Sequence, residues 1–155
     1  MISEEKKMRQ VLIINGPNMN MLGQREPEKY GFDTLDEINE KIAEEATELE
    51  IECDFIQSNY EGEIVALIHN SEDYEAIVLN AAAYTHYSIA IRDAISSVSI
   101  PVVEIHMSNI YGREEFRQHS VLTPVCVGSI VGFGWKGYVL ALSALVDIID
   151  KRAVK

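Results

Sequence analysis

Residues 11–31 combine a short apolar run with an unusually long polar loop, and they read VLIINGPNMNMLGQREPEKYG. The run at 11–14 is typical of a buried strand, whereas the next helical pattern begins only at Leu35. An ordinary connection between a strand and a helix takes roughly two to six residues, and long ordered loops usually carry function. Glycines make some points of this loop flexible, and prolines make others stiff. Such a loop could close as a lid that covers a bound small molecule. The alternative is a surface loop that has no function of its own.

Strand and helix patterns alternate along the rest of the chain. Thr34 and Glu37 form a capping-box pattern, which predicts that a helix starts at Leu35 and continues to Leu49. Further strands are expected at 51–55, 76–79, 101–105 and 125–131, and further helices around 64–68, 89–95 and 137–152. The polar connection 106–123 is expected to hold one short helix.

This alternation indicates an α/β fold in which helices cover both faces of a parallel sheet. With five strands, the leading arrangement is a flavodoxin-like three-layer sandwich with strand order 2-1-3-4-5. Its ligand crevice lies at the carboxyl ends of the first and third strands. We expect residues 1–155 to form a single catalytic domain, with 1–9 as a loosely ordered N-terminal extension.

Composition excludes several classes of protein. The formal net charge of −12 argues against a nucleic-acid surface, which needs clustered lysines and arginines. A charged N-terminal segment and the lack of a long apolar run argue against a secretory signal or a membrane span, so we expect a cytoplasmic protein. Cys53 and Cys126 lie in apolar, strand-like surroundings without metal-ligand spacing, and we interpret both as reduced core residues.

Polar side chains gather in the three loops that follow the first, third and fourth strands. Because these strand ends meet at one edge of a parallel sheet, the side chains are expected to converge there. The residues concerned are Asn18, Arg25, Tyr30, Asn80, His86, His106, Ser108, Arg113 and Arg117. Taken singly, each has a structural explanation: Asn80 could bond loop backbone, His86 could cap a helix, and His106 could be a satisfied core histidine. Their arrival at one edge from distant segments favours a site, and the arginines suggest an anionic ligand.

The sequence lacks the motifs of several other kinds of functional site. The chain has no phosphate-binding glycine loop, no nucleophile elbow, and no metal spacing among its four histidines, so no metal and no cofactor are expected. A phosphoacceptor receiver domain would need carboxylates at the first and third strand ends, where this chain has Asn15 and Asn80.

The remaining groups suit acid–base chemistry. A phenol with a normal pKa near 10 is a poor base at neutral pH, but a neighbouring guanidinium favours its phenolate form. Tyr30 is therefore a candidate general base, and His106 is the candidate acid that protonates a departing hydroxyl. Asn18 could orient a water or an enolate oxygen. Together they suit proton removal beside a carbonyl followed by loss of water.

Three motifs then carry a resemblance to a known family. They are NGPNxNxLGxREP at 15–27, YTHxSxAIRDA at 84–94 and EIHxSNxxxREEFRxHS at 104–120. These long motifs resemble those of type II 3-dehydroquinate dehydratase. The resemblance implies conversion of 3-dehydroquinate to 3-dehydroshikimate by anti elimination through an enolate, without a cofactor or a Schiff base. The reaction would serve the shikimate pathway or quinate breakdown.

The resemblance also implies a role for each matched residue. The catalytic set would be Tyr30 as base, Arg25 supporting it from the lid, Asn18 holding a water, and His106 as acid. Asn80 would place His106, with Glu104 near it. The substrate carboxylate would meet Met107 and Ser108, the ring hydroxyls would meet His86 and Arg117, and Arg113 would lie near Tyr30. Asp93 would reach a neighbouring subunit's site in a homo-oligomer, a dodecamer built from trimers.

The chain departs from the family pattern after the third strand, where Ala82-Ala83 stands in place of a frequent glycine. An alternative function also stays open. A flavodoxin-like module that binds a small anion or a nucleotide would use Tyr30 and His106 as contacts only.

Overall fold

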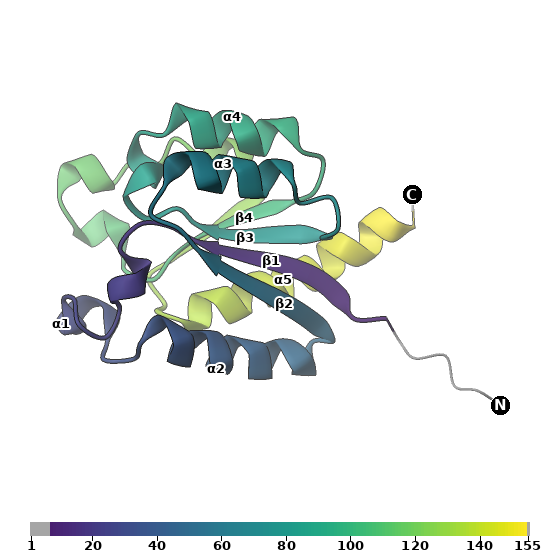
Figure 1. The fold of residues 1–155 in the computed structure, drawn as a ribbon, viewed down its shortest axis with the longest axis horizontal. Helices are drawn as coiled ribbons and strands as arrows, with labels where there is room; N and C mark the ends of the chain where they lie inside the picture. Colours follow the sequence, from purple (N-terminus) through teal and green to yellow (C-terminus); the bar gives the residue numbers. More distant parts are fainter. Residues whose placement is uncertain (1–6, 155) are drawn as a thin grey trace.

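A five-stranded parallel sheet forms the centre of the molecule in the computed structural model, which describes residues 7–154 (Figure 1). The strands are β1 (Arg9–Asn15), β2 (Ile51–Gln57), β3 (Ala76–Asn80), β4 (Val102–His106) and β5 (Gly128–Val131). Their order is β2-β1-β3-β4-β5, and every neighbouring pair is parallel. The predicted flavodoxin-like order is therefore confirmed.

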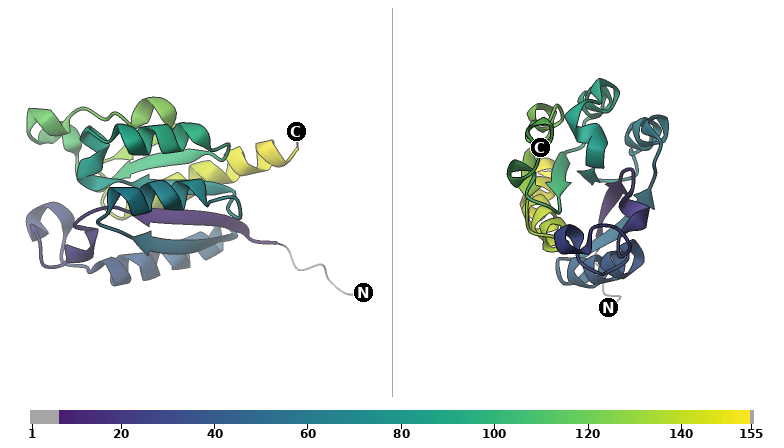
Figure 2. Two further views of the ribbon diagram at one scale, coloured as in Figure 1. Left: turned by 45° about the horizontal axis from the view of Figure 1, so that its top comes forward. Right: turned by 90° about the vertical axis from the view of Figure 1, so that its left-hand side faces the viewer.

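Four helices cover the two faces of the sheet (Figures 1 and 2). Helices α2 (Leu35–Glu48) and α5 (Lys136–Ala153) lie on one face, and α3 (Glu61–His69) and α4 (Ile89–Ser97) lie on the other. A further short helix, α1 (Pro27–Tyr30), belongs to the loop after β1. None of the helices in the described part of the chain is both long and apolar enough to cross a membrane.

Strand β1 shows why a run of four apolar residues forms a central strand. Val11 and Ile13 belong to the core cluster on the α2 and α5 face, while Leu12 and Ile14 belong to the cluster on the α3 and α4 face. All four are at most 2% exposed. Alternate side chains point to opposite faces, so a strand covered on both sides needs apolar residues at every position.

Local signals start the first long helix and shape the crevice. The side chain of Thr34 accepts a hydrogen bond from the Glu37 amide, and the Glu37 carboxylate accepts one from the Thr34 amide, so the predicted capping box is confirmed. After β1, the Gly16 amide donates to the Asn80 carbonyl at 2.7 Å. A Cβ at Gly16 would lie 2.7 Å from the Ala81 carbonyl oxygen, so only glycine permits this close approach of the two loops.

Four expectations about local structure need correction. Strand β5 begins at Gly128 rather than at 125, because 123–125 forms a 3₁₀ turn with Pro124 in it. The connection 106–123 holds separate 3₁₀ turns, Ile110–Gly112 and Glu115–Arg117, rather than one helix. In α5, the helical spacing predicts a buried side made of Val139, Leu142, Leu145, Val146 and Ile149; Leu142, Leu145 and Ile149 are buried as expected, whereas Val139 is only partly buried and its neighbour Tyr138 is fully buried. At the N-terminus, β1 already begins at Arg9; residues 1–6 of the expected extension lie outside the described residues.

Candidate active site

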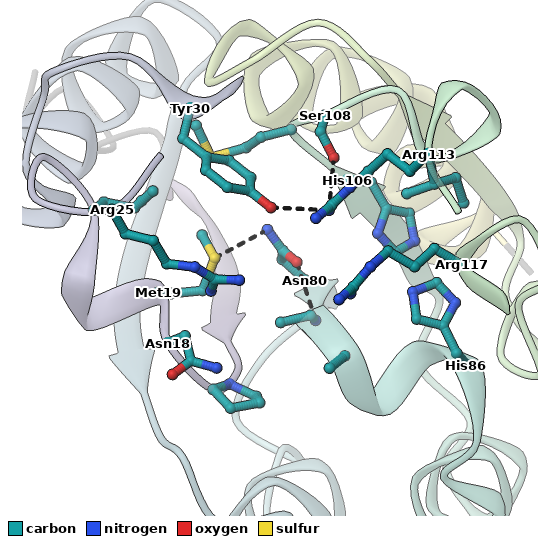
Figure 3. Close-up of a pocket in the computed structure, with 16 residues that line it drawn as sticks. Asn18, Met19, Arg25, Tyr30, Asn80, His86, His106, Ser108, Arg113 and Arg117 are labelled. Atoms are coloured by element: carbon teal, nitrogen blue, oxygen red, sulfur yellow. Dashed lines mark hydrogen bonds between the residues drawn. The ribbon is translucent and has the colours of Figure 1, made fainter. Parts of the chain in front are cut away.

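A cavity of about 150 Å³ opens at the carboxyl edge of the sheet, between the loops that follow β1, β3 and β4 (Figure 3). Ten of the eleven expected site residues line it, and these are Asn18, Arg25, Tyr30, Asn80, His86, His106, Met107, Ser108, Arg113 and Arg117. Asp93 is the exception, since it lies exposed on α4 and outside the cavity. The predicted convergence of three loops is therefore observed within one subunit.

We call residues 16–31 the lid, and its C-terminal end presents the phenol of Tyr30 to the cavity. Figure 3 shows this oxygen directed toward Arg113, whose Nη1 donates to it at 2.9 Å. The same Nη1 atom lies 3.4 Å from the Ser108 hydroxyl. The guanidinium carbons of Arg25 and Arg113 lie 5.8 and 5.9 Å from the centre of the phenol ring. Two cations therefore lie beside the phenol, and one of them donates a hydrogen bond to its oxygen.

Arg113 keeps further hydrogen-bonding capacity beside the phenol. Its Nε atom is buried and has no hydrogen-bond partner among the residues that the structure describes. A buried N–H without a partner is costly, and it becomes favourable once an acceptor arrives. This guanidinium is therefore suited both to hold the phenol and to meet an anionic ligand.

The N-terminal half of the lid is anchored in the core by Met19 and Leu22, whereas residues 23–29 are held by polar contacts near the surface. The Asn18 amide donates to the Asn59 side chain at 3.0 Å, and Asn18 adopts a left-handed backbone with φ of 68°. Arg25 and Lys29 both pair with Glu26. The hydrogen bond from Lys29 is the main cause that holds the pKa of Glu26 below its usual value. Exposed pairs of this kind contribute little stability, so residues 23–29 of the lid have few strong restraints.

We call Asn80, Glu104, His106 and Tyr138 the floor of the site, because they are buried on or beneath the strand ends. Nε2 of His106 lies 2.6 Å from Oε2 of Glu104, a carboxylate with no exposed surface. Burial alone would raise the pKa of Glu104, but hydrogen bonds from His106, Thr123 and Ser120 bring it below its usual value. An ionised Glu104 accepts a hydrogen bond from Nε2 of His106 and so holds this ring in place at the edge of the cavity.

Asn80 is fixed by a buried phenol that the sequence motifs did not indicate. Its Nδ2 atom donates to the Tyr138 hydroxyl at 3.0 Å, and its Oδ1 atom accepts from the Ala82 amide at 3.2 Å. The Tyr138 hydroxyl in turn donates to Asn15. Burial raises the pKa of Tyr138, so the phenol stays neutral and can donate. Among the described residues no hydrogen bond joins Asn80 to His106, so the amide is placed by Tyr138 rather than by the histidine.

His86 and Arg117 complete the wall opposite the lid (Figure 3). Nδ1 of His86 donates to the His119 carbonyl at 2.8 Å, and the His86 ring stacks on that of His106 at 6.4 Å between centres. Burial is the largest cause that lowers the pKa of His86, and the charges of His106 and Arg117 act in the same direction. Arg117 is oriented by a 2.9 Å hydrogen bond to Glu114. A neutral His86 can then offer Nε2 to a hydroxyl group.

The departure at Ala82 has a visible structural consequence. Ala82 has a φ of 51°, which lies in the left-handed region where glycine is preferred. The backbone therefore keeps the conformation that a glycine would favour, with a strain of about 1–2 kcal/mol.

Within residues 7–154, no group of three or more histidine, cysteine or acidic side chains could hold a metal ion. Cys53 and Cys126 are free, and burial raises the pKa of each thiol to about 12, which agrees with unreactive core thiols.

Comparison with known proteins connects this geometry to one family. The family model for dehydroquinase class II matches residues 9–146. A 3-dehydroquinate dehydratase of Caldanaerobacter subterraneus is 56% identical over 144 residues, covering 92% of this chain and 97% of that protein. One from Trichodesmium erythraeum is 52% identical over 143 residues, covering 92% and 95%.

Solved structures give the same result. The type II dehydroquinase of Propionibacterium acnes has a TM-score of 0.87 and 42% identity, covering 92% of this chain and 99% of that one. The type II dehydroquinase of Butyrivibrio crossotus has a TM-score of 0.87 and 46% identity, covering 90% and 99%. The resemblance carried by the three motifs is confirmed, and the chain belongs to the class II dehydroquinase family.

Proposed function

We propose that this protein is a 3-dehydroquinate dehydratase of the type II class, acting in the shikimate pathway or in quinate breakdown. One observation carries the proposal. A phenol held by a guanidinium and a histidine held by a buried carboxylate line the same small cavity, on different loops. An elimination needs a base and an acid placed in this way, whereas a binding module does not.

In the proposed reaction, the Tyr30 phenolate takes a proton from the carbon beside the substrate carbonyl. The electron pair of that C–H bond moves onto the carbonyl oxygen and forms an enolate. When the enolate collapses, the new C=C bond forms, the C–O bond of the neighbouring hydroxyl breaks, and His106 supplies the proton with which this group leaves as water. Asn18 would hold a water against the enolate oxygen, and Arg25 would add positive charge to the closed lid.

Substrate binding would use the loops after β3 and β4. Backbone amides at Met107 and Ser108, with the Ser108 hydroxyl, would donate hydrogen bonds to the carboxylate. His86, Arg117 and Asn80 would contact the ring and its hydroxyls. The buried Nε of Arg113, which has no hydrogen-bond partner within residues 7–154, supports an anionic substrate at this end of the cavity.

Assembly is part of the proposal. Asp93 lies exposed on α4, outside the cavity of its own subunit, as expected of a residue that serves a neighbouring site. We propose a homo-oligomer, a dodecamer of trimers, located in the cytoplasm. Sedimentation that shows a fully active monomer would contradict this part.

The reaction itself is tested with purified protein and 3-dehydroquinate, because the conjugated enone of the product absorbs where the substrate does not. We expect turnover without added metal or cofactor, and no loss of activity when borohydride is added with substrate. Inactivation by borohydride would indicate a Schiff base, for which Lys29 is the only lid lysine. Protein that retains a nucleotide and shows no turnover would favour the alternative binding module.

A further inference from the structure

Two hydroxyl groups on the loop between β4 and β5 contact Glu104, the carboxylate that is paired with His106. The Ser120 hydroxyl donates to Oε2 of Glu104 at 2.7 Å, and the Thr123 hydroxyl donates to Oε1 of the same carboxylate. Glu104 is the last residue but two of β4, and His106 ends that strand. The carboxylate thus receives three hydrogen bonds, two from these hydroxyls and one on the side of His106.

The direction of the Ser120 hydrogen bond is decided by counting its donors and acceptors. A serine hydroxyl has one hydrogen and two acceptor positions. The Ser120 oxygen accepts from the amides of Leu122 and Thr123, each at 3.1 Å. Both acceptor positions are then occupied, so its only hydrogen goes to Glu104, and the carboxylate oxygen must act as the acceptor.

Counting donors and acceptors also shows which nitrogen of His106 carries a hydrogen. Hydrogen bonds donated to a carboxylate favour its ionised form, and an ionised carboxylate can only accept. The atom of His106 that faces Glu104 is Nε2, so this nitrogen must carry a hydrogen. The remaining ring nitrogen, Nδ1, is then the atom at which a proton is gained or lost.

We propose that Ser120 and Thr123 are positioning residues that hold Glu104 as an ionised acceptor, fix the hydrogen on Nε2 of His106, and make Nδ1 the atom that delivers the proton to the departing hydroxyl. The inference rests on the proposed function for the delivery step, while the tautomer of His106 follows from the hydrogen-bond network alone. In that step the Nδ1–H bond breaks, an O–H bond forms on the leaving group, water departs, and His106 stays neutral with its hydrogen on Nε2.

Other charged and titratable groups surround this pair. His86 faces it from the turn after β3, and Tyr30 faces it across the cavity. Arg113 and Arg117 come from the loop after β4, and Cys126 lies close enough to Glu104 to sense its charge. Among the described residues, Glu104 is the only one of these groups that is hydrogen-bonded to the His106 ring, so the carboxylate and its two hydroxyl donors decide which ring nitrogen carries the hydrogen.

The kinetic test uses Thr123→Val, which removes one hydrogen bond from Glu104 but keeps the side-chain shape. Thr123 is exposed, so the fold should tolerate the change. We expect kcat to fall roughly 3- to 10-fold with little change in KM, and the basic limb of the kcat profile to move to lower pH. Thr123→Ser should restore both. Thr47→Val, on the distant helix α2, is the matched control and should behave as the wild type.

Direct observation of the ring completes the test. ¹⁵N-histidine NMR of the wild-type protein, with His106 assigned by its loss in His106→Asn, should show neutral His106 protonated on Nε2. A tautomer protonated on Nδ1, or a Thr123→Val enzyme with unchanged kcat and pH profile, would overturn the inference. Failure of the proposed function is a different result, because a wild-type protein without turnover could still show the expected tautomer.

Discussion

The outer part of the lid, residues 23–31, and the floor of the same cavity are held in opposite ways. The lid is anchored in the core at Met19 and Leu22, but farther along it Arg25 keeps 37% of its side chain exposed and pairs with the partly exposed Glu26. On the floor, Asn80, Glu104 and His106 are at most 5% exposed, and hydrogen bonds join them to side chains from distant segments. Weak surface contacts let a loop open and close, whereas a buried network keeps its groups in place between turnovers. The base is therefore on the part that can move, and the acid is on the part that is preorganised.

The largest expected effect is on the lid. Tyr30→Phe keeps the ring but removes the proton acceptor, so turnover should fall by about 10²–10⁴-fold, the range for loss of a general base. Binding of the product should change much less. Tyr60→Phe, at an exposed tyrosine, is the matched control. Near-normal turnover of Tyr30→Phe would place the base elsewhere, with His86 as the next candidate.

Arg113→Lys tests the contact between the loop after β4 and the lid. Lysine keeps the charge but loses the planar guanidinium that reaches both Tyr30 and Ser108. A hydrogen bond to a charged group contributes about 1.5–3 kcal/mol, so we expect kcat to fall roughly 10- to 100-fold. Steady-state kinetics measures this. A variant as active as the wild type would mean that the phenol does not depend on this guanidinium.

Tyr138→Phe tests whether the buried hydrogen bonds beneath the floor stabilise the protein. The change removes the hydroxyl that donates to Asn15 Oδ1 and accepts from Asn80 Nδ2, whose remaining contact among the described residues is the Met19 sulfur at 3.7 Å. Loss of these buried hydrogen bonds costs about 1–3 kcal/mol of unfolding free energy. Urea unfolding, compared with Tyr87→Phe at an exposed position, measures the loss. If the two variants were equally stable, the buried network would not be what restrains the floor.

Ala82→Gly should raise the free energy of unfolding rather than lower it. Glycine relieves the left-handed strain at this position but loses more chain entropy on folding, so a net gain of about 0.5–1 kcal/mol is expected. The midpoint of thermal unfolding should rise slightly, with activity retained. Ala83→Gly, the neighbour without a positive φ, should lower stability instead.

The smallest expected effect is a change in the pH dependence of stability. Because the pKa of His86 is lowered in the folded protein, the unfolded chain binds more protons than the folded one below about pH 6.5. His86 therefore lowers the free energy of unfolding as the pH falls through about 6.5, and it has no such effect at higher pH. His86→Gln should flatten the slope of unfolding free energy between pH 7 and 5, whereas His69→Gln, at an exposed position, should not.

Local patterns in the sequence determined most of the architecture and the membership of the site. The apolar run at 11–14, the capping box at Thr34 and the alternation of strands and helices each depend on neighbours within a few residues, so they can be recognised without a fold. Strand order then placed three polar loops at one edge, and ten expected residues line one cavity. The three motifs supplied the family.

Tertiary structure alone decided how the site residues are held. Tyr138 lies 123 residues from Asn15, and Thr123 lies 19 residues from Glu104, so no local pattern relates either pair. Helical periodicity correctly predicted most of the buried side of α5, but it placed Val139 there and did not indicate Tyr138, whose buried hydroxyl bonds Asn15 and Asn80 at the strand ends. Buried polar groups must be satisfied by whatever the fold brings to them, and that partner is known only when distant segments meet.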